Sequence, residues 1–320
     1  MKVVDMKYAF VGFVLTNSVW IFVVFKDVLR FQVSFVNNTR TIPSKILTRT
    51  SPLLVLFTSW NSSMESGNVY NNTLFMWREL GSDVSLVLFT NDTKTKTIAE
   101  SFNWKVLPLR RTSCNGIPIL KDMFTTAMAT YNESKFFGYS NSDILFNKGL
   151  KNTLTMILNQ TLLLKRAPVL ITGRRIDSPV GLTEQIRTWT YFDRVSLRGL
   201  MSNAFALDYF IMTKGFNWKE FPDLVIGRPK IDNWLIFYAR RKGVTVIDAS
   251  ASITALHQKT KKRKKIVREC NKEILMKSRR IKFLQNKVVK GNAECAHYET
   301  RYLKTDILTL IKRGLYSTGC

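Results

Sequence analysis

Short apolar runs alternate with segments of helical period from residue 52 to residue 146. Apolar runs of strand length lie at 52–58, 84–90, 104–109 and 136–140. Apolar side chains recur at helical spacing at 69–80, 94–102 and 119–131. Further strands are expected at 169–172, 204–212 and 244–247, and a further helix at 231–241. This alternation predicts an α/β fold whose mostly parallel central sheet is covered by helices on both faces.

A polar break interrupts the pattern where one strand should stop. The apolar run at 136–139 is followed by Asn141-Ser142-Asp143, and an apolar run resumes at 144–146. Ligands of open α/β sheets bind at the carboxyl ends of strands. Asp143 is therefore placed where a carboxylate can meet a hard divalent cation that carries substrate phosphates. The alternative is structural, since Asn141 and Asp143 could form a turn or cap the next helix.

The N-terminal segment 8–25 contains 18 residues without a charge, which is just long enough to span a bilayer. We expect an uncleaved signal anchor, because no small-x-small cleavage motif follows it. A cleaved signal peptide and a buried N-terminal helix are the alternatives. The expected organisation is a cytosolic tail at 1–7, the anchor at 8–25, a polar stem at 26–50, a folded domain at 51–258 and a basic, partly helical tail at 259–320.

Glycosylation motifs and cysteines bear on the compartment. Six Asn-x-Ser/Thr sequons begin at Asn37, Asn61, Asn71, Asn91, Asn132 and Asn159. All lie before residue 160, which favours a lumenal position for the chain after the anchor. Four cysteines, Cys114, Cys270, Cys295 and Cys320, are compatible with one or two disulfides, and the spacing does not give their pairing.

The positive charge of the chain is large and uneven. The net charge is +26, and residues 259–290 hold fourteen Lys/Arg against two Glu, a net +12. Such charge predicts affinity for anions: nucleotide phosphates, acidic glycans, anionic lipid or nucleic acid. A nucleic-acid or lipid-binding tail is therefore one hypothesis. The predicted anchor and the lack of an aromatic and basic platform argue against nucleic acid.

Anchor, polar stem, α/β domain and a strand-end carboxylate together resemble Golgi glycosyltransferases of the GT-A type, over residues 51–258. The resemblance implies a nucleotide-sugar donor, whose diphosphate is held by a metal at the last Asp of a D-x-D-like motif. Asp143 matches that metal-binding position. Asn141 replaces the first Asp, and its amide could still hydrogen-bond the donor ribose.

Three further segments match in order. Residues 115–121 are similar to the segment that opens the helix beneath the donor nucleotide, where Lys121, Arg110 or Arg111 could reach phosphate. A solvated pair is the alternative for the two arginines. Asp92, which follows the second strand, would approach the nucleotide base.

The other two segments match on the acceptor and metal side. Residues 227–234 resemble the acceptor-side loop, and Asp232 would be the base of an inverting reaction, with the helix dipole helping to hold it ionised. A helix cap is the alternative for Asp232. His257 resembles the C-terminal histidine that completes the metal site or touches the diphosphate, and an exposed loop histidine without a role is its alternative.

The resemblance implies a metal-assisted glycosyltransferase that uses Mn²⁺ or Mg²⁺ and moves a sugar to a hydroxyl of a glycan or glycoprotein. An acidic acceptor would suit the basic tail. The implied location is the Golgi or ER membrane, in single-pass type II orientation, with no nucleic-acid partner. The main alternative is a degenerate glycan-binding protein of the same fold. No HExxH, GxSxG or P-loop motif competes for the chemistry.

Overall fold

The central element of the fold is a nine-stranded sheet. A computed structural model describes residues 51–60, 67–179, 185–258, 269–277, 291–304, 306–314 and 320. The strand order is β15-β14-β12-β8-β11-β6-β1-β2-β3. Their bounds are β1 Leu54–Thr58, β2 Val84–Phe89, β3 Lys105–Leu107, β6 Phe136–Ser140, β8 Val169–Thr172, β11 Tyr209–Met212, β12 Thr245–Asp248, β14 Tyr298–Tyr302 and β15 Leu308–Lys312. Five of the eight neighbouring pairs are parallel and three are antiparallel. The sheet is thus mixed, and the predicted α/β class with a mostly parallel sheet is confirmed.

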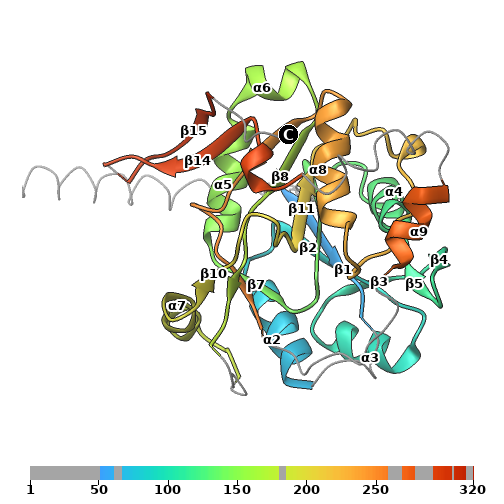
Figure 1. The fold of residues 1–320 in the computed structure, drawn as a ribbon. Coiled ribbons are helices and arrows are strands. Elements are labelled where there is room, and N and C mark those ends of the chain that lie inside the picture. Colours follow the sequence, from blue (N-terminus) through green and yellow to red (C-terminus); the bar gives the residue numbers. More distant parts are fainter. Residues whose placement is uncertain are drawn as a thin grey trace, which may run out of the picture. The chain divides into compact units, whose positions relative to one another are not determined.

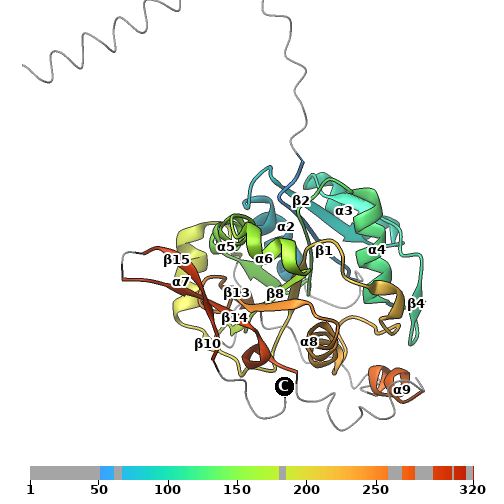
Figure 2. The same ribbon diagram turned by 90° about the horizontal axis from the view of Figure 1, so that it is seen from above.

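Helices flank both faces of this sheet, as the pattern predicted (Figures 1 and 2). One apolar cluster joins the sheet to α4 (Leu120–Thr130) and α8 (Ile231–Arg241). A second cluster joins the opposite face to α2 (Gly67–Arg78), α3 (Thr93–Ser101) and α5 (Gly149–Leu158). The remaining helices of the described residues are α6 (Thr161–Arg166), α7 (Trp189–Leu197) and α9 (Cys270–Lys277).

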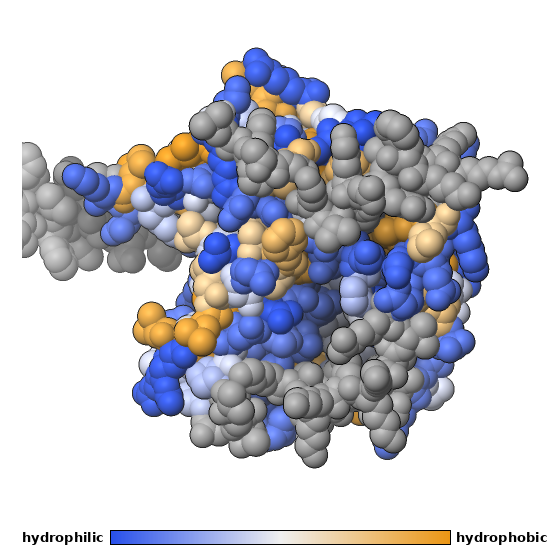
Figure 3. All heavy atoms as spheres, in the orientation of Figure 1, coloured by the Kyte–Doolittle hydropathy of each residue, from blue (hydrophilic) through white to orange (hydrophobic). Residues whose placement is uncertain are grey.

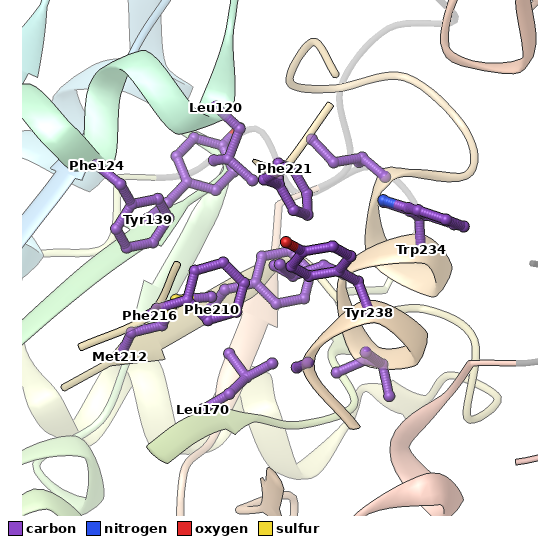
Figure 4. Close-up of a cluster of buried hydrophobic side chains, with 14 of the residues drawn as sticks. Leu120, Phe124, Tyr139, Leu170, Phe210, Met212, Phe216, Phe221, Trp234 and Tyr238 are labelled. Atoms are coloured by element: carbon purple, nitrogen blue, oxygen red, sulfur yellow. The ribbon is translucent and has the colours of Figure 1, made fainter. Parts of the chain in front are cut away.

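The inner strands β1, β2, β6, β8 and β11 are mainly apolar because both of their faces are buried, whereas the outer strands β3, β14 and β15 are partly exposed. In β1, Val55 and Phe57 belong to the α4–α8 cluster, whereas Leu54 and Leu56 belong to the cluster on the other face. Alternate side chains of a strand point to opposite faces. Figure 4 shows the first cluster, in which aromatic side chains from several elements lie together. Continuous apolar runs are therefore what a sheet covered on both sides requires.

A smaller sheet lies beside the carboxyl ends of the central strands. It has the order β10-β9-β13-β7. The bounds are β7 Ile144–Phe146, β9 Ile176–Asp177, β10 Leu200–Met201 and β13 Ala255–His257. The sequence pattern did not predict this sheet, because strands of two or three residues are too short to show a period. A hairpin of β4 (Thr112–Ser113) and β5 (Ile117–Pro118) completes the described strands.

The described parts of the segment 259–320 differ from the tail that the composition predicted. β14 and β15 extend the central sheet, and residues Thr50–Cys320 form one compact unit. Two disulfides hold the segment, Cys114–Cys270 with a Cα–Cα distance of 6.2 Å and Cys295–Cys320 with 5.3 Å. The prediction of a tail was wrong because it rested on the basic composition alone. The two disulfides and the pairing of β14 and β15 with the sheet hold these residues in the fold. The basic runs at 259–268 and 278–290 lie outside the described residues.

The predicted cytosolic tail, anchor and stem, residues 1–50, also lie outside the described residues. Within the described part of the chain, no helix has the length and apolar character needed to cross a membrane.

Candidate functional site

The Asn141–Asp143 turn follows β6 at the edge where the parallel strands β1, β2 and β6 end. The Asn141 amide donates to the carbonyl of Asp208 over 2.9 Å, and the Asn141 carbonyl accepts from the Ile144 amide over 3.2 Å. The next element is strand β7, so the helix-cap interpretation of Asn141 and Asp143 is wrong. Asp143 is buried, with 5% of its surface exposed. Burial of a carboxylate is costly unless the carboxylate is paired or binds a cation. A simple surface turn would not require a buried carboxylate.

Strand pairing places His257 beside Asp143. In β13, His257 is the register partner of Ile144 in β7 and of Asp177 in β9. The His257 Nε2 atom lies 3.4 Å from Asp143 Oδ2, and Nδ1 lies 2.8 Å from Asp177 Oδ1. The His257 side chain is 18% exposed. The alternative of an exposed loop histidine is therefore wrong.

Asp177 is held by three side chains. Besides His257, Arg175 Nε donates to Asp177 Oδ1 over 2.9 Å, and Ser202 Oγ donates to Asp177 Oδ2 over 2.7 Å. Both carboxylate oxygens are thus engaged. Against the effect of partial burial, which raises it, the Ser202 hydrogen bond and the charges of Arg175 and His257 lower the pKa of Asp177.

Asp208 connects this group to the Asn141 turn. It precedes β11 and is almost fully buried. Arg175 Nη1 donates to Asp208 Oδ2 over 2.7 Å, and Asn141 Nδ2 donates to Asp208 Oδ1 over 2.6 Å. The Asn141 Oδ1 atom accepts from the Tyr139 hydroxyl over 2.7 Å. The amide that could bind a ribose therefore already holds two protein groups.

Burial and like charges set the remaining protonation preferences. Burial raises the pKa of Asp208 and the charge of Asp143 adds to this, while Arg175 opposes both. For His257, burial lowers the pKa, but the neighbouring Asp143 carboxylate outweighs this effect and raises the pKa above its ordinary value. The site holds more carboxylates than cations, and this imbalance favours binding of an added cation.

Asp232 lies in the first turn of α8, where the sequence placed it. Burial, together with the charge of Asp208, raises its pKa well above the usual range. The expectation that the helix dipole would help to keep it ionised is thus outweighed by desolvation. No side chain of the described residues hydrogen-bonds Asp232, in contrast to Asp177 and Asp208.

A cavity of about 460 Å³ opens at the same edge of the sheet. Its lining residues come from the end of β6, from the segments that follow β1, β2, β3 and β6, from α2, from the β4–β5 hairpin and from the loop before α8. They are Ser59, Trp60, Tyr70, Thr90, Asn91, Asp92, Leu109, Thr112, Cys114, Asn115, Gly116, Ile117, Pro118, Tyr139, Asn141, Ser142, Ile226, Gly227 and Arg228. The volume lies within the range of about 300–1,000 Å³ that small-molecule sites have. Asn141 and Ser142 line the cavity and directly precede Asp143 in the chain, whereas Asp143 and His257 are not among the lining residues. Figure 3 shows the face of the molecule in the orientation of Figure 1, with a hollow that hydrophilic residues border on one side.

The cavity contains some of the predicted nucleotide residues and not others. Asp92 lines it, and Asp92 Oδ2 also accepts from the Thr95 amide over 3.2 Å as the N-cap of α3. Arg111 and Lys121 instead pair with Asp223, and Lys121 Nζ lies 2.6 Å from Asp223 Oδ1. Neither of these side chains, nor that of Arg110, is among the lining residues. Their contact with phosphate stays a prediction that the described geometry does not favour.

One wall of the cavity is cross-linked. Cys114 lines the cavity and its disulfide partner Cys270 begins α9. The buried Asn271 side chain accepts from the Val225 amide over 2.9 Å and donates to the Val225 carbonyl over 3.0 Å. α9 therefore fixes the β4–β5 hairpin against the loop that precedes α8.

The spacing of Asp143 and His257 can be compared with that of two ligands on a divalent cation. No group of three or more His, Cys, Asp or Glu side chains among the described residues is arranged to hold a metal. Two ligands at adjacent corners of an octahedral shell, each about 2.1 Å from the ion, lie about 3 Å apart. The 3.4 Å separation of His257 Nε2 and Asp143 Oδ2 is close to that value. The pair fits a cation that takes its other ligands from diphosphate and water, as Mg²⁺ typically does.

Arg175, Asp177 and Asp208 are site residues that the sequence argument missed. The signal was present. Charged residues follow the predicted strand 169–172 after Gly173, and Asp208 is the one charge within the apolar run 204–212. Charge in or beside a buried strand is costly unless it is paired, so these positions could have been added to the candidates.

No protein-family model matches the chain, and no curated protein matches it. Solved structures with similar folds include a cytidylyltransferase from Leptospira borgpetersenii, with a TM-score of 0.36 and 14% identity over 63% of this chain and 76% of that one. The 4-diphosphocytidyl-2C-methyl-D-erythritol synthase from Anaerococcus prevotii has a TM-score of 0.36 and 12% identity, over 70% and 99%. A mycobacterial protein has a TM-score of 0.39 and 11% identity, over 83% and 85%. Similarity at this level leaves the activity to be argued from the residues of this chain.

Proposed function

We propose that the protein is a glycosyltransferase that uses a nucleotide-diphosphate sugar and a divalent cation. The observation that carries the proposal is the cavity at the ends of β1, β2, β3 and β6, whose lining residues Asn141 and Ser142 directly precede Asp143 of the Asp143–His257 pair. A nucleoside would occupy the cavity, and the diphosphate would extend from it to the pair. Arg228, the only cation among the cavity's described lining residues, would contribute positive charge on the phosphate side.

Asp143 and His257 would hold the cation, and the imidazole ligand favours Mn²⁺ over Mg²⁺. When bound, such a cation neutralises negative charge that develops on the diphosphate as the bond to the sugar breaks. Asp143 is buried and His257 is fixed between two carboxylates, so both ligands are held in place before the donor arrives. Preorganised ligands of this kind lower the cost of assembling a site.

Asp232 would accept the proton of the acceptor hydroxyl if the reaction inverts the sugar. A base works best when its pKa is close to the working pH, and burial and Asp208 move the pKa of Asp232 in that direction. Asp177 and Asp208 are poorer candidates because other side chains occupy their oxygens.

The test is release of nucleotide diphosphate from UDP- and GDP-sugars, with and without Mn²⁺. We expect slow Mn²⁺-dependent release from one donor even without an acceptor, because water can take the acceptor's place. Asp143→Ala should abolish this release while the protein stays folded. Asp193→Ala removes an exposed aspartate of α7 and serves as the matched control. Full activity of the Asp143→Ala variant would contradict the assignment of the cation site.

A degenerate, glycan-binding protein of this fold is the second candidate. It is favoured by the engagement of the Asn141 amide with Tyr139 and Asp208 and by the provision of only two cation ligands among the described residues. Retained glycan binding without any release of nucleotide diphosphate would support it. The membrane anchor, the Golgi or ER location and the glycan or glycoprotein acceptor are part of the proposal.

A further inference from the structure

The two ring nitrogens of His257 have different surroundings. Nδ1 faces Asp177 Oδ1 at 2.8 Å, a normal hydrogen-bond distance, whereas Nε2 faces Asp143 Oδ2 at 3.4 Å, which is longer than a good hydrogen bond. A neutral imidazole carries one proton and one lone pair. The shorter contact therefore takes the proton at Nδ1, and the lone pair is left on Nε2, on the side of Asp143.

Asp177 is itself fixed, and so it can fix the ring. Arg175 and Ser202 donate to its two oxygens over 2.9 and 2.7 Å. The parallel pairing of β9 with β13 sets Asp177 directly beside His257 in the backbone register. With both oxygens engaged, and with the imidazole ring between the two carboxylates, Asp177 is not in position to share a cation with Asp143.

We infer that Asp177 is a positioning residue, which holds the His257 ring so that Nε2 presents its lone pair beside Asp143. This inference rests on the proposed function, because it gives the purpose of the arrangement: Nε2 and Asp143 Oδ2 are the two cation ligands. A carboxylate on the far nitrogen of a metal-binding histidine fixes both the proton position and the ring orientation, and its loss typically costs about 10–100-fold in metal affinity.

The second histidine of the chain provides an internal reference. His297 Nδ1 accepts a hydrogen bond from the Val246 amide over 3.0 Å. Its lone pair is therefore on Nδ1 and its proton is on Nε2. The chain contains two histidines. Their hydrogen bonds assign them opposite tautomers in the metal-free protein.

The experiment is nitrogen-15 NMR of the full chain labelled at histidine, without metal and at alkaline pH. We expect the signals of one imidazole protonated at Nδ1 and of one protonated at Nε2. The Nδ1–H signal should disappear in a His257→Gln variant, and the Nε2–H signal should remain. In Asp177→Ala the His257 signal should shift towards the Nε2–H form. Asp177→Asn keeps an oxygen that can accept from Nδ1 and should largely restore the Nδ1–H form. Asp193→Ala should leave both rings unchanged.

Mn²⁺ titration of the same proteins, followed by the electron paramagnetic resonance of free Mn²⁺, gives the second measurement. Asp177→Ala should weaken binding about 10–100-fold, with Asp193→Ala as the control. An Nε2–H tautomer of His257 in the unsubstituted protein would overturn the inference without any variant. If that protein binds Mn²⁺ and Asp177→Ala binds it equally well, the inference alone fails. If the unsubstituted protein binds no Mn²⁺ even with UDP or GDP present, the proposed function fails with it.

Discussion

Replacing Arg175 by Met tests the charge balance on which the site depends. The substitution keeps an unbranched apolar side chain and removes the guanidinium. Arg175 donates to the buried Asp208 over 2.7 Å and to the half-buried Asp177 over 2.9 Å. Methionine can make neither contact. The variant therefore leaves a buried carboxylate without its opposite charge.

The two contacts of Arg175 contribute different amounts to the free energy of unfolding. Breaking a buried ion pair by removing one partner costs about 3–5 kcal/mol. The Arg175 side chain is 27% exposed and that of Asp208 is 9% exposed, so the lower end of that range applies to Asp208. The contact with Asp177, which is 32% exposed, contributes about 0–1 kcal/mol. We expect the free energy of unfolding to fall by about 3 kcal/mol at neutral pH.

The loss should depend on pH, with a definite sign. The pKa of Asp208 is already raised in the folded protein, and removal of Arg175 raises it further. An acid whose folded pKa exceeds its unfolded pKa costs no stability below the unfolded value of about 4 and costs progressively more as the pH rises towards the folded value. The penalty of Arg175→Met should therefore be smaller at pH 4.5 than at pH 7.5.

Urea denaturation at these two pH values measures the effect. The set comprises the unsubstituted protein, Arg175→Met, Asp208→Asn and the double variant. Because Asp208→Asn removes the carboxylate charge that Arg175 balances, the double variant should be more stable than Arg175→Met at pH 7.5, with a coupling energy above about 1 kcal/mol. An equal loss at both pH values, with no relief in the double variant, would refute the reasoning.

Three further predictions concern the rest of the fold. Cys114→Ser should destabilise the protein more than Cys295→Ser in non-reducing urea denaturation. The two disulfides span 156 and 25 residues, and the chain-entropy model gives them stabilisations of about 5 and about 3.5 kcal/mol. The opposite order of stability would contradict this prediction. Gly149→Ala should cost about 1–3 kcal/mol, because its Cβ would lie 2.0 Å from the Ser252 carbonyl oxygen, and an unchanged urea midpoint would argue against that packing. The raised pKa of His257 contributes stability below about pH 6.5 that is lost as the pH rises through the folded pKa, so His257→Gln should flatten the decline of Tm between about pH 6 and pH 8.5.

The central sheet was predictable because burial on both faces leaves a simple pattern. The strand Val169–Thr172 and the helix Ile231–Arg241 have the bounds expected from the sequence. The apolar run 204–212 was expected as one strand, but only Tyr209–Met212 forms a strand, and Leu207 makes an isolated bridge to Arg174. The small sheet gave no signal, because its pairs are formed by segments far apart in the chain.

The site was predictable only in part for the same reason. Asp143 and His257 were predicted from a strand end and from a family resemblance, and the structure places them side by side. The surrounding residues come from two separate segments: Asp177 lies in β9, Arg175 directly precedes β9, and Asp208 directly precedes β11. Only tertiary pairing brings them together. Lys121 illustrates the opposite case, because its position at a helix start suggested phosphate, whereas it pairs with Asp223.

The most direct test of the account is a thermal-shift titration of the purified full-length chain with UDP and GDP, each with and without Mn²⁺. We expect one of the two nucleotides to raise Tm only when Mn²⁺ is present, by an amount that corresponds to about 2.7 kcal/mol at 100 times its Kd, and we expect Asp143→Ala to remove the shift. A folded sample that neither nucleotide stabilises, with or without Mn²⁺, would contradict the central claim that this edge of the sheet binds a nucleotide diphosphate through a cation.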